Sequence, residues 1–212
     1  MTVTISSLVS STAANLEDSG FARWTQTELV EYCNRAIEDV CRLKPDAYTV
    51  RSTIQLTSGP IQTLPTGGHR LIRATRNMGE NGAVPGDAIR HVNLDAKTDF
   101  DLAWYADANA TQVDDVMYDE ANPLEFYVSP PALVYIEIIY AAIPTSVTIS
   151  DNLPLLDIYR TPILYFMQAF ALQSNRSDAD FARANAYLGL AFSSLGLQMQ
   201  NEKLLRLPDR SS

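Results

Sequence analysis

The fold is decided by residues 114–144, which read DDVMYDEANPLEFYVSPPALVYIEIIYAAIP. Within this stretch, residues 133–140 are almost entirely β-branched, aromatic or aliphatic, and Glu137 is their single charge. Such a run is the strongest strand signal in the chain, because these side chains pack well on a pleated surface. It predicts the central strand of a sheet.

Two shorter strands are predicted ahead of this run, at residues 116–118 and 124–128. Asn122 and Pro123 favour a turn between them, because proline fixes its own φ and pushes the preceding residue out of the helical region. Together the three segments predict an antiparallel sheet in the middle of a chain whose two ends look helical.

The residues before this sheet continue the β pattern. Residues 50–56 alternate between apolar and polar, and together with 61–64 they predict a hairpin across the Ser58-Gly59-Pro60 turn. Further strands are predicted at 69–78 and 88–92, with Gly79, Gly82 and Gly86 between them in a loop. A short helix packed on the sheet is predicted within 95–105, with Phe100, Ala103 and Trp104 on one face.

The N-terminal residues carry two helix signatures. Apolar side chains from Ile5 to Leu16 follow helical spacing and predict a first helix. Thr25 and Glu28 have the spacing of a capping box, which predicts a second helix over residues 26–43, stopped by Pro45. Cys33 and Cys41 lie eight residues apart on this helix, too far apart for a disulfide, and are expected to be buried free thiols.

Two more helices are predicted after residue 150. The first has helical apolar spacing over 155–170, with Pro162 either kinking it or starting it after a Thr161 cap. The second begins at a box-like pair, Ser177 and Asp180. Its apolar stripe comprises Phe181, Ala184, Leu188, Ala191, Phe192, Leu195 and Met199. The other sides of this helix carry the small residues Ala182, Ala186, Gly189 and Ser193. Small residues allow the backbone of a neighbouring element to approach closely, which indicates either an inter-subunit contact or a central core helix.

The predicted architecture is therefore α+β. The N- and C-terminal helices, residues 1–47 and 150–202, are expected to form one helical bundle. Residues 48–149 are an inserted antiparallel β-sheet region, and residues 203–212 are a C-terminal tail. This tail mixes leucines with positive charges at Lys203, Leu204, Leu205, Arg206, Leu207 and Arg210. It is either frayed or binds an acidic, grooved partner.

Composition limits the function classes. The 212 residues contain 16 Lys and Arg against 25 Asp and Glu, a formal net charge of −9. An acidic chain does not grip nucleic acid by neutralising phosphates, although it could surround DNA without holding it. No unbroken apolar stretch of membrane-spanning length is present, and residues 1–4 lack the features of a secretory signal.

A search for catalytic patterns finds no recognisable site. His69 and His91 have no partner at metal-ligand spacing, so neither a metal nor a cofactor is expected. The acidic residues Asp114, Asp115, Asp119 and Glu120 do not have the spacing of a calcium loop and are expected to be solvated carboxylates. A binding or structural protein is therefore expected rather than an enzyme.

Several motifs, in order along the chain, resemble the head-to-tail adaptor proteins of the short-tailed phage neck. They are Trp24-Thr25 with Glu28-Leu29 and Tyr32-Cys33-Asn34, then residues 69–73 (HRLIR) with 76–79 (RNMG), then 118–131 (YDEANPLEFYVSPP) followed by the strand, and finally 155–159 (LLDIY). None is chemically specific alone, but the ordered set spans nearly the whole chain.

The resemblance implies a structural virion protein, assembled in the host cytoplasm, that forms a ring of typically twelve copies. The ring would lie between the portal protein and the tail nozzle and extend the DNA channel. On this reading, the tail from Lys203 to Arg210 is the expected portal contact, and Asp114, Asp115, Asp119 and Glu120 are expected to face the channel. The alternatives are another neck or tail-completion protein, or a hydrolase-like enzyme with a polar pocket at His69 or His91.

Overall fold

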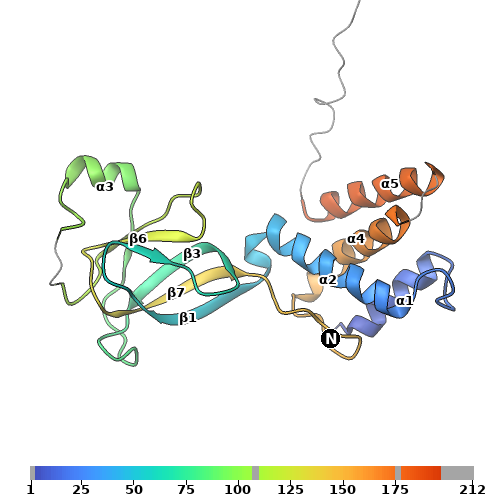
Figure 1. The fold of residues 1–212 in the computed structure, drawn as a ribbon, viewed down its shortest axis with the longest axis horizontal. Helices are drawn as coiled ribbons and strands as arrows, with labels where there is room; N and C mark the ends of the chain where they lie inside the picture. The colour runs from blue at the N-terminus through green and yellow to red at the C-terminus, as the bar shows by residue number, and fades with distance from the viewer. Residues whose placement is uncertain (1–2, 107–109, 175–177, 197–212) are drawn as a thin grey trace, which may run out of the picture. The chain divides into compact units, whose positions relative to one another are not determined.

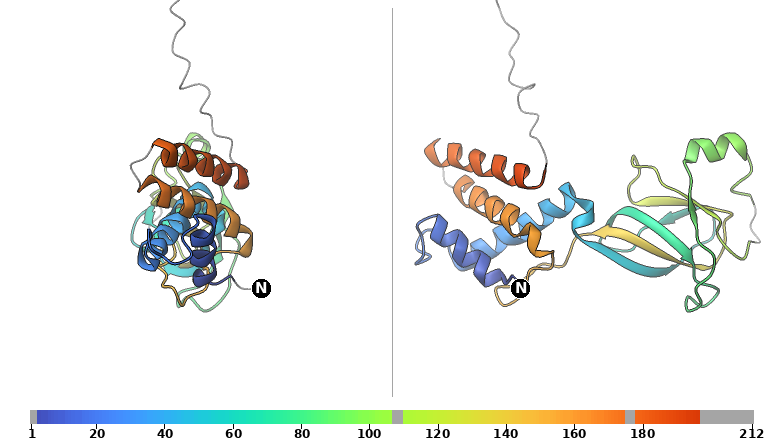
Figure 2. Two further views of the ribbon diagram at one scale, coloured as in Figure 1. Left: turned by 90° about the vertical axis from the view of Figure 1, so that its right-hand side faces the viewer. Right: turned by 180° about the vertical axis from the view of Figure 1, so that it is seen from behind.

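The computed structural model describes residues 3–106, 110–174 and 178–196, and has five α-helices and two β-sheets in this part of the chain. The predicted α+β class is confirmed (Figure 1). The chain divides into two compact units, residues 1–44 with 145–212, and residues 45–144. The first is helical and the second is rich in strands (Figures 1 and 2).

The helical unit is built around α4. Its helices are α1 (Ile5–Asn15), α2 (Gln26–Leu43), α4 (Arg160–Gln173) and α5 (Asp178–Ser194), with the 3-10 helix η2 (Asp157–Tyr159) before α4. Helix α4 packs against α1, α2 and α5. Its most deeply buried side chains include Ile163, Phe166 and Met167. Burial of this apolar surface stabilises the unit.

The capping box predicted for α2 is present. Glu28 N donates to Thr25 Oγ1 at 3.3 Å, and Thr25 N donates to Glu28 Oε2 at 2.8 Å. The helix runs over Gln26–Leu43, as the sequence predicts. Cys33 and Cys41 are both buried and free, and burial raises the pKa of the Cys33 thiol to about 12. The two thiols are therefore packing groups rather than reactive ones.

Asp18 organises the loop between α1 and α2. Its carboxylate accepts hydrogen bonds from the backbone N–H groups of Trp24 at 2.9 Å, Arg23 at 3.0 Å and Ala22 at 2.9 Å. The hydrogen bond from Trp24, together with those from Arg23 and Ala22, lowers the pKa of Asp18. This lowering outweighs the rise in pKa that desolvation causes. The loop also holds Glu17 and Phe21 at positive φ, a backbone strain that these bonds help to offset.

Asp18 should make the stability of the helical unit depend on acidity. A carboxyl whose pKa is lowered by folding contributes stability above its unfolded pKa of about 3.9, and this contribution disappears as pH falls through the folded value. In a Trp104→Phe background, urea unfolding followed by Trp24 fluorescence at pH 7 and at pH 3 should show a smaller pH dependence of stability with Asp18→Asn than without it. An equal pH dependence in both proteins would contradict this assignment.

Two details of the C-terminal helices differ from the sequence prediction. Helix α4 begins at Arg160, so Pro162 is its third residue and neither kinks it nor starts it. Its missing N–H falls in the first turn, where no intrahelical partner exists anyway. In α5, Ala184, Ala191 and Leu195 are buried, but Phe181 is 57% exposed because it lies at the edge of this buried line. Ser177 and Met199 lie outside the described residues.

The β-rich unit contains two sheets. Its elements are the 3-10 helix η1 (Pro45–Ala47), β1 (Thr49–Gln55), β2 (Ile61–Thr63), β3 (Gly68–Asn77), β4 (Arg90–His91), α3 (Leu94–Phe100), β5 (Asp115–Met117), β6 (Glu125–Ser129) and β7 (Tyr135–Ala142). One sheet has the order β1-β7-β3, and the other has the order β2-β6-β5-β4. The long strand β7 is central in its sheet, and β5 pairs antiparallel with β6.

The prediction of one antiparallel sheet with a hairpin at residues 50–64 is wrong. Strand β1 pairs with β7 and β2 pairs with β6, so the turn at Ser58–Pro60 carries the chain from one sheet to the other. The buried Gln62 fixes this crossing, because its side chain donates to Thr57 O and Gly59 O and accepts from Thr57 N. In addition, the short strand β4 pairs parallel with β5.

The two sheets enclose one core. Side chains from both sheets and from the segments between them contribute to it: Leu56, Leu71, Ala74, Ile89, Val113, Val116, Phe126, Val128, Ala132, Val134, Ile136, Ile138, Tyr140 and Ala142. In β7 the even-numbered residues point into this core, so the odd-numbered residues lie on the outer face of their sheet. The same alternation puts Val116, Phe126 and Val128 inside, and Met117, Tyr127 and Ser129 outside, in the second sheet.

The helix predicted within residues 95–105 is shorter than expected. It ends at Phe100 because Asp101 adopts an extended backbone, with φ −142° and ψ 88°. Phe100 is therefore 92% exposed instead of sharing a buried face with Trp104, which is only 9% exposed. The segment after the helix turns Trp104 alone onto the sheet.

Candidate interaction surfaces

The first surface is the uncovered face of α5. The small residues Ala182, Ala186 and Ser193 are exposed there and Gly189 is half-buried. This face lies opposite the buried side of α5, which is formed by Ala184, Ala191 and Leu195. The small residues and the buried residues are about half a helical turn apart. Phe181 and Leu190, 57% and 48% exposed, flank it. The face is therefore apolar, shallow and without charge along its centre, which is unusual for a solvated helix.

The second surface is a row of arginines on the outer face of the β1-β7-β3 sheet, and we call it the arginine face. Three bulges in β3 place Arg70, Arg73 and Arg76 opposite Ala141, Ile139 and Glu137 of β7. On the other side of β7, Arg51 of β1 is also paired with Ile139. All four arginines therefore lie on the side of the sheet that faces away from the core.

The arginines differ in how far their charges are compensated. Arg76 pairs with Glu137 at 3.3 Å, and Arg70 pairs with Glu120. Glu137 also accepts a hydrogen bond from Thr75, and this bond together with Arg76 and the more distant Arg51 lowers the pKa of Glu137. Within the described residues, no ion pair is formed by Arg51 or Arg73. The centre of the arginine face is therefore positive.

Sequence reasoning missed this arginine face. The residues are spaced by three along β3, and in a regular strand residues three apart point to opposite faces. The bulges insert one unpaired residue after every two paired residues and so return every third side chain to the same face. The RxxRxxR spacing within a predicted strand is the signal that could have suggested it.

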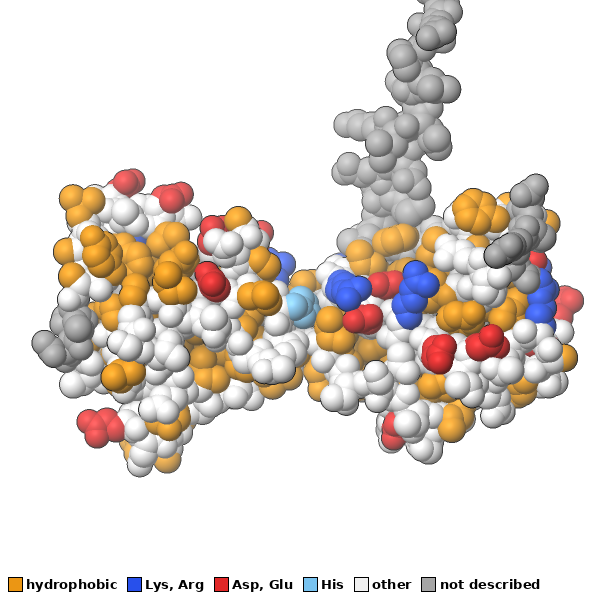
Figure 3. Space-filling model, viewed as in Figure 1, with side chains coloured by type: hydrophobic (Ala, Val, Ile, Leu, Met, Phe, Trp, Pro, Cys, Tyr) orange, Lys and Arg blue, Asp and Glu red, His pale blue; other side chains and the backbone are white. Residues whose placement is uncertain are grey.

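The third surface is formed by α3 and the segment after it, and we call residues 95–105 the α3 patch. Phe100, Leu102 and Tyr105 are 92%, 77% and 57% exposed, and Asp95, Asp99 and Asp101 are exposed beside them. Figure 3 shows hydrophobic side chains gathered over this part of the β-rich unit with acidic side chains at its edge. Large apolar side chains exposed together indicate an interaction site.

The α3 patch is held firmly on the second sheet. Lys97 Nζ lies 3.1 Å from Asp115 Oδ2 and 3.4 Å from Asp101 Oδ2. Burial opposes the charge on Lys97, but its bonds to these two carboxylates raise its pKa. The Trp104 ring packs edge-on against the Tyr127 ring, with the ring centroids 6.2 Å apart. The Trp104 carbonyl oxygen accepts a hydrogen bond from Ser129 Oγ at 3.3 Å. The exposed Phe100 and Leu102 are therefore presented from an anchored support.

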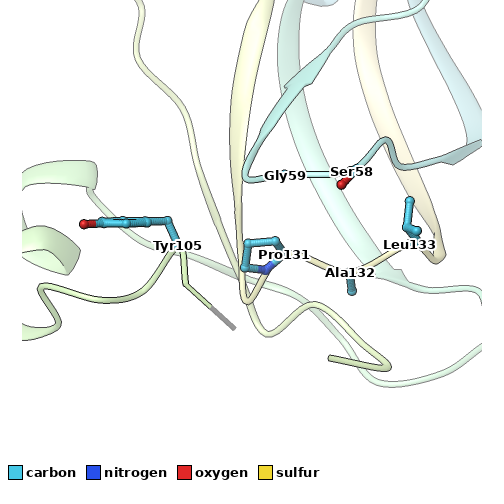
Figure 4. Close-up of a pocket in the computed structure, with 6 residues that line it drawn as sticks. All are labelled: Ser58, Gly59, Tyr105, Pro131, Ala132 and Leu133. Atoms are coloured by element: carbon cyan, nitrogen blue, oxygen red, sulfur yellow. The ribbon is translucent and has the colours of Figure 1, made fainter. Parts of the chain in front are cut away.

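A cavity of 140 Å³ adjoins the same region and is lined by Ser58, Gly59, Tyr105, Pro131, Ala132 and Leu133. In Figure 4, Pro131 lies between the side chains of Tyr105 and Leu133, and Leu133 is 66% exposed. The helical unit has another cavity, of 250 Å³, lined by Gln26, Thr27, Val30, Val147, Thr148 and Ile149. Neither cavity is lined by a histidine.

The four carboxylates predicted as a solvated group are in different environments. Asp114 and Glu120 are exposed and Asp119 is half-buried, but Asp115 is only 4% exposed. Asp115 lies beneath the α3 patch, where it binds Lys97 and also Arg90 at 2.9 Å. The expectation that Asp115 is a solvated carboxylate is therefore wrong, because its charge is compensated by Lys97 and Arg90 inside the unit, and its channel-facing position stays a prediction.

His91 Nε2 lies 3.0 Å from Ala74 N and 3.1 Å from Ala74 O, against the backbone of β3. Among the described residues, no cluster of three or more His, Cys, Asp or Glu side chains could hold a metal, and no helix is long and apolar enough to span a membrane. The tail from Lys203 to Arg210 lies outside the described residues.

Uncovered apolar and charged surfaces on two well-packed units are typical of a protein that works within an assembly. The chain belongs to the SU10 adaptor protein family, whose family model matches residues 3–210. No curated protein matches it. The resemblance to phage head-to-tail adaptors is thereby confirmed, and the chain is a phage adaptor protein of a structural family.

Proposed function

We propose that this adaptor forms a ring, with twelve copies as the expected number, between the portal protein and the tail nozzle of a phage neck. The observation that carries the proposal is the family match over almost the entire chain. In the ring, the helices act as one bundle and the chain extends the DNA channel without holding DNA. A net charge of −9 supports this role, because a channel for sliding DNA should not bind phosphate.

The face of α5 with Ala182, Ala186, Gly189 and Ser193 is the proposed lateral contact of the helical unit. A closed ring needs heterologous interfaces, in which one surface of each copy binds a different surface of the next. Small side chains on this face permit a neighbouring element to approach closely, and Phe181 and Leu190 at its edges would be covered on assembly. Burial of exposed apolar surface of this kind drives association.

The C-terminal tail is the proposed portal contact. Its leucines, Leu204, Leu205 and Leu207, alternate with the positive charges of Lys203, Arg206 and Arg210 in a chain that is otherwise acidic. Such a segment suits an apolar groove with an acidic rim, as in the recognition of short peptides by grooved partners.

Truncation after Glu202 should therefore weaken binding to the portal ring by at least about a hundredfold, since it removes three leucine anchors and three positive charges. The measurement is titration of the full-length and truncated chains onto purified portal rings from the same phage. A chain that replaces only the three charges with serine serves as a partial control. Unchanged portal binding after truncation would refute the tail as the contact.

The exposed carboxylates Asp114 and Glu120, with the half-buried Asp119, are proposed to face the channel. Reversing two of them, Asp114→Lys with Glu120→Lys, should slow DNA release from assembled particles, because the new positive charges attract phosphates. Glu80→Lys, an exposed reversal elsewhere in the same unit, is the matched control. Ejection rates equal to those of wild-type particles would argue against a channel position.

A further inference from the structure

The arginine face and the α3 patch lie on opposite sides of the same unit. The arginines belong to the outer face of the β1-β7-β3 sheet, because their paired residues in β7 are the ones that point away from the core. The α3 patch covers the outer face of the other sheet, through contacts to Asp115, Tyr127 and Ser129. The shared core lies between them.

The two surfaces are complementary in chemistry. The α3 patch presents Phe100 and Leu102 with three exposed aspartates around them. The arginine face presents Arg51 and Arg73 on either side of the half-buried Ile139, with Ile72 41% exposed next to Arg73. Each surface therefore combines exposed apolar side chains with an excess of one charge, positive on the arginine face and negative on the α3 patch.

We propose that the arginine face of one copy binds the α3 patch of the next copy, so that the β-rich units join head to tail. Surfaces on opposite sides of one unit can bind each other only between copies, and this is the heterologous contact that closes into a ring. The inference rests on the proposed ring and names the residues that its β-rich units would use. Opposite charges at the rim guide the association of the two surfaces and fix their orientation. Phe100 and Leu102 of the α3 patch lose their contact with water when the surfaces meet.

A second copy fits the arginine face better than nucleic acid does. Residues 45–144 carry six Lys and Arg against thirteen Asp and Glu, so a polyanion approaching this unit is repelled overall. Two of the four arginines are also already paired with Glu137 and Glu120. The two remaining charges are matched by a compact acidic patch rather than by an extended phosphate backbone.

The test uses two full-length cysteine variants that keep every charge. Thr53→Cys lies on the arginine face, and Ala96→Cys lies on the α3 patch, both at exposed positions. The two variants are mixed in equal amounts, assembled on portal rings and oxidised mildly. The native Cys33 and Cys41 are buried and should not compete. The disulfide between the two variants is expected to exceed either same-variant disulfide by at least about fivefold.

Charge exchange then separates recognition from folding. Adding Arg51→Glu and Arg73→Glu to the Thr53→Cys chain should remove the excess of the disulfide between the two variants. The ratio of this disulfide to the same-variant disulfides should then be the one expected from random pairing. Combining that chain with an Ala96→Cys chain that carries Asp95→Arg and Asp99→Arg should restore the excess, which a folding defect could not do. Raising the salt to about 1 M should also lower the excess, because the Debye length falls to about 3 Å.

Four results would overturn the inference. One is a statistical disulfide ratio in rings that do form on the portal, and another is failure of the exchanged pair to restore the excess; both leave the proposed ring intact. The third is binding of a duplex DNA fragment at about 150 mM salt that is lost in Arg51→Glu with Arg73→Glu, which would assign the face to nucleic acid. Failure of the unmodified chain to form any ring, seen in its mass before oxidation, overturns both proposals.

Discussion

Gly189→Leu is expected to prevent ring assembly on the portal while leaving the isolated chain at least as stable as the wild type. A Cβ added at Gly189 would have no atom within 4 Å, so the monomer has room for a larger side chain. Glycine inside a helix also costs about 0.5–1 kcal/mol relative to better helix formers. A neighbouring copy packed on the small-residue face of α5 would instead meet the new side chain directly.

The experiment compares thermal unfolding of the isolated chain with its assembly on portal rings. Ala14→Leu, at an exposed position of α1, is the matched control, because it adds a similar side chain away from the proposed interface. We expect wild-type assembly for Ala14→Leu, and no assembly for Gly189→Leu although its melting temperature is equal to or higher than that of the wild type. Normal rings from Gly189→Leu would show that α5 is not the lateral contact.

Asn77→Ala should cost the β-rich unit about 3 kcal/mol of unfolding free energy, because it leaves buried backbone groups without partners. Asn77 Nδ2 donates to Val113 O at 2.8 Å, and Val113 N donates to Asn77 Oδ1 at 2.9 Å. Val113 is completely buried at the entry to β5, and Asn77 is 5% exposed. Its side chain therefore joins the end of β3 to a distant segment as a strand would.

This loss can be measured on one unit at a time, because Trp24 lies in the helical unit and Trp104 in the β-rich unit. In a Trp24→Phe background, urea unfolding followed by Trp104 fluorescence reports the β-rich unit. Asn122→Ala, in the exposed turn before β6, is the control. A change below about 1 kcal/mol for Asn77→Ala would mean that solvent replaces the lost bonds and that the segment is less buried than described.

Elements specified by neighbouring residues could be predicted from the sequence. The capping box of Thr25 and Glu28 sets the start of α2, and the long apolar run sets β7, whatever the rest of the chain does. The pairing of the strands was harder to predict. Strands β1 and β2, on either side of the Ser58–Pro60 turn, are adjacent in sequence, yet β1 pairs with β7 and β2 pairs with β6. The strand pairing depends on the side chain of Gln62 bonding to the turn and on contacts with strands sixty or more residues away.

The candidate surfaces show the same division. The small, uncharged face of α5 was visible in its sequence, because a helix has one regular period and the small residues recur on it. The arginine face was missed, because three bulges change the period of β3 from the two of a regular strand to three. Phe100 was assigned to a buried face for a related reason, since the extended backbone at Asp101 that ends α3 is not marked by glycine or proline.

The central claim, that this adaptor assembles as a ring on the portal, is tested most directly by the mass of the complex formed when the chain is mixed with purified portal rings, measured by native mass spectrometry. We expect a stoichiometric increase in mass, with about twelve copies added per portal ring and heterologous contacts between them. A portal ring of unchanged mass beside a compact, unassociated chain would contradict the account and direct attention to small-molecule ligands at the two cavities.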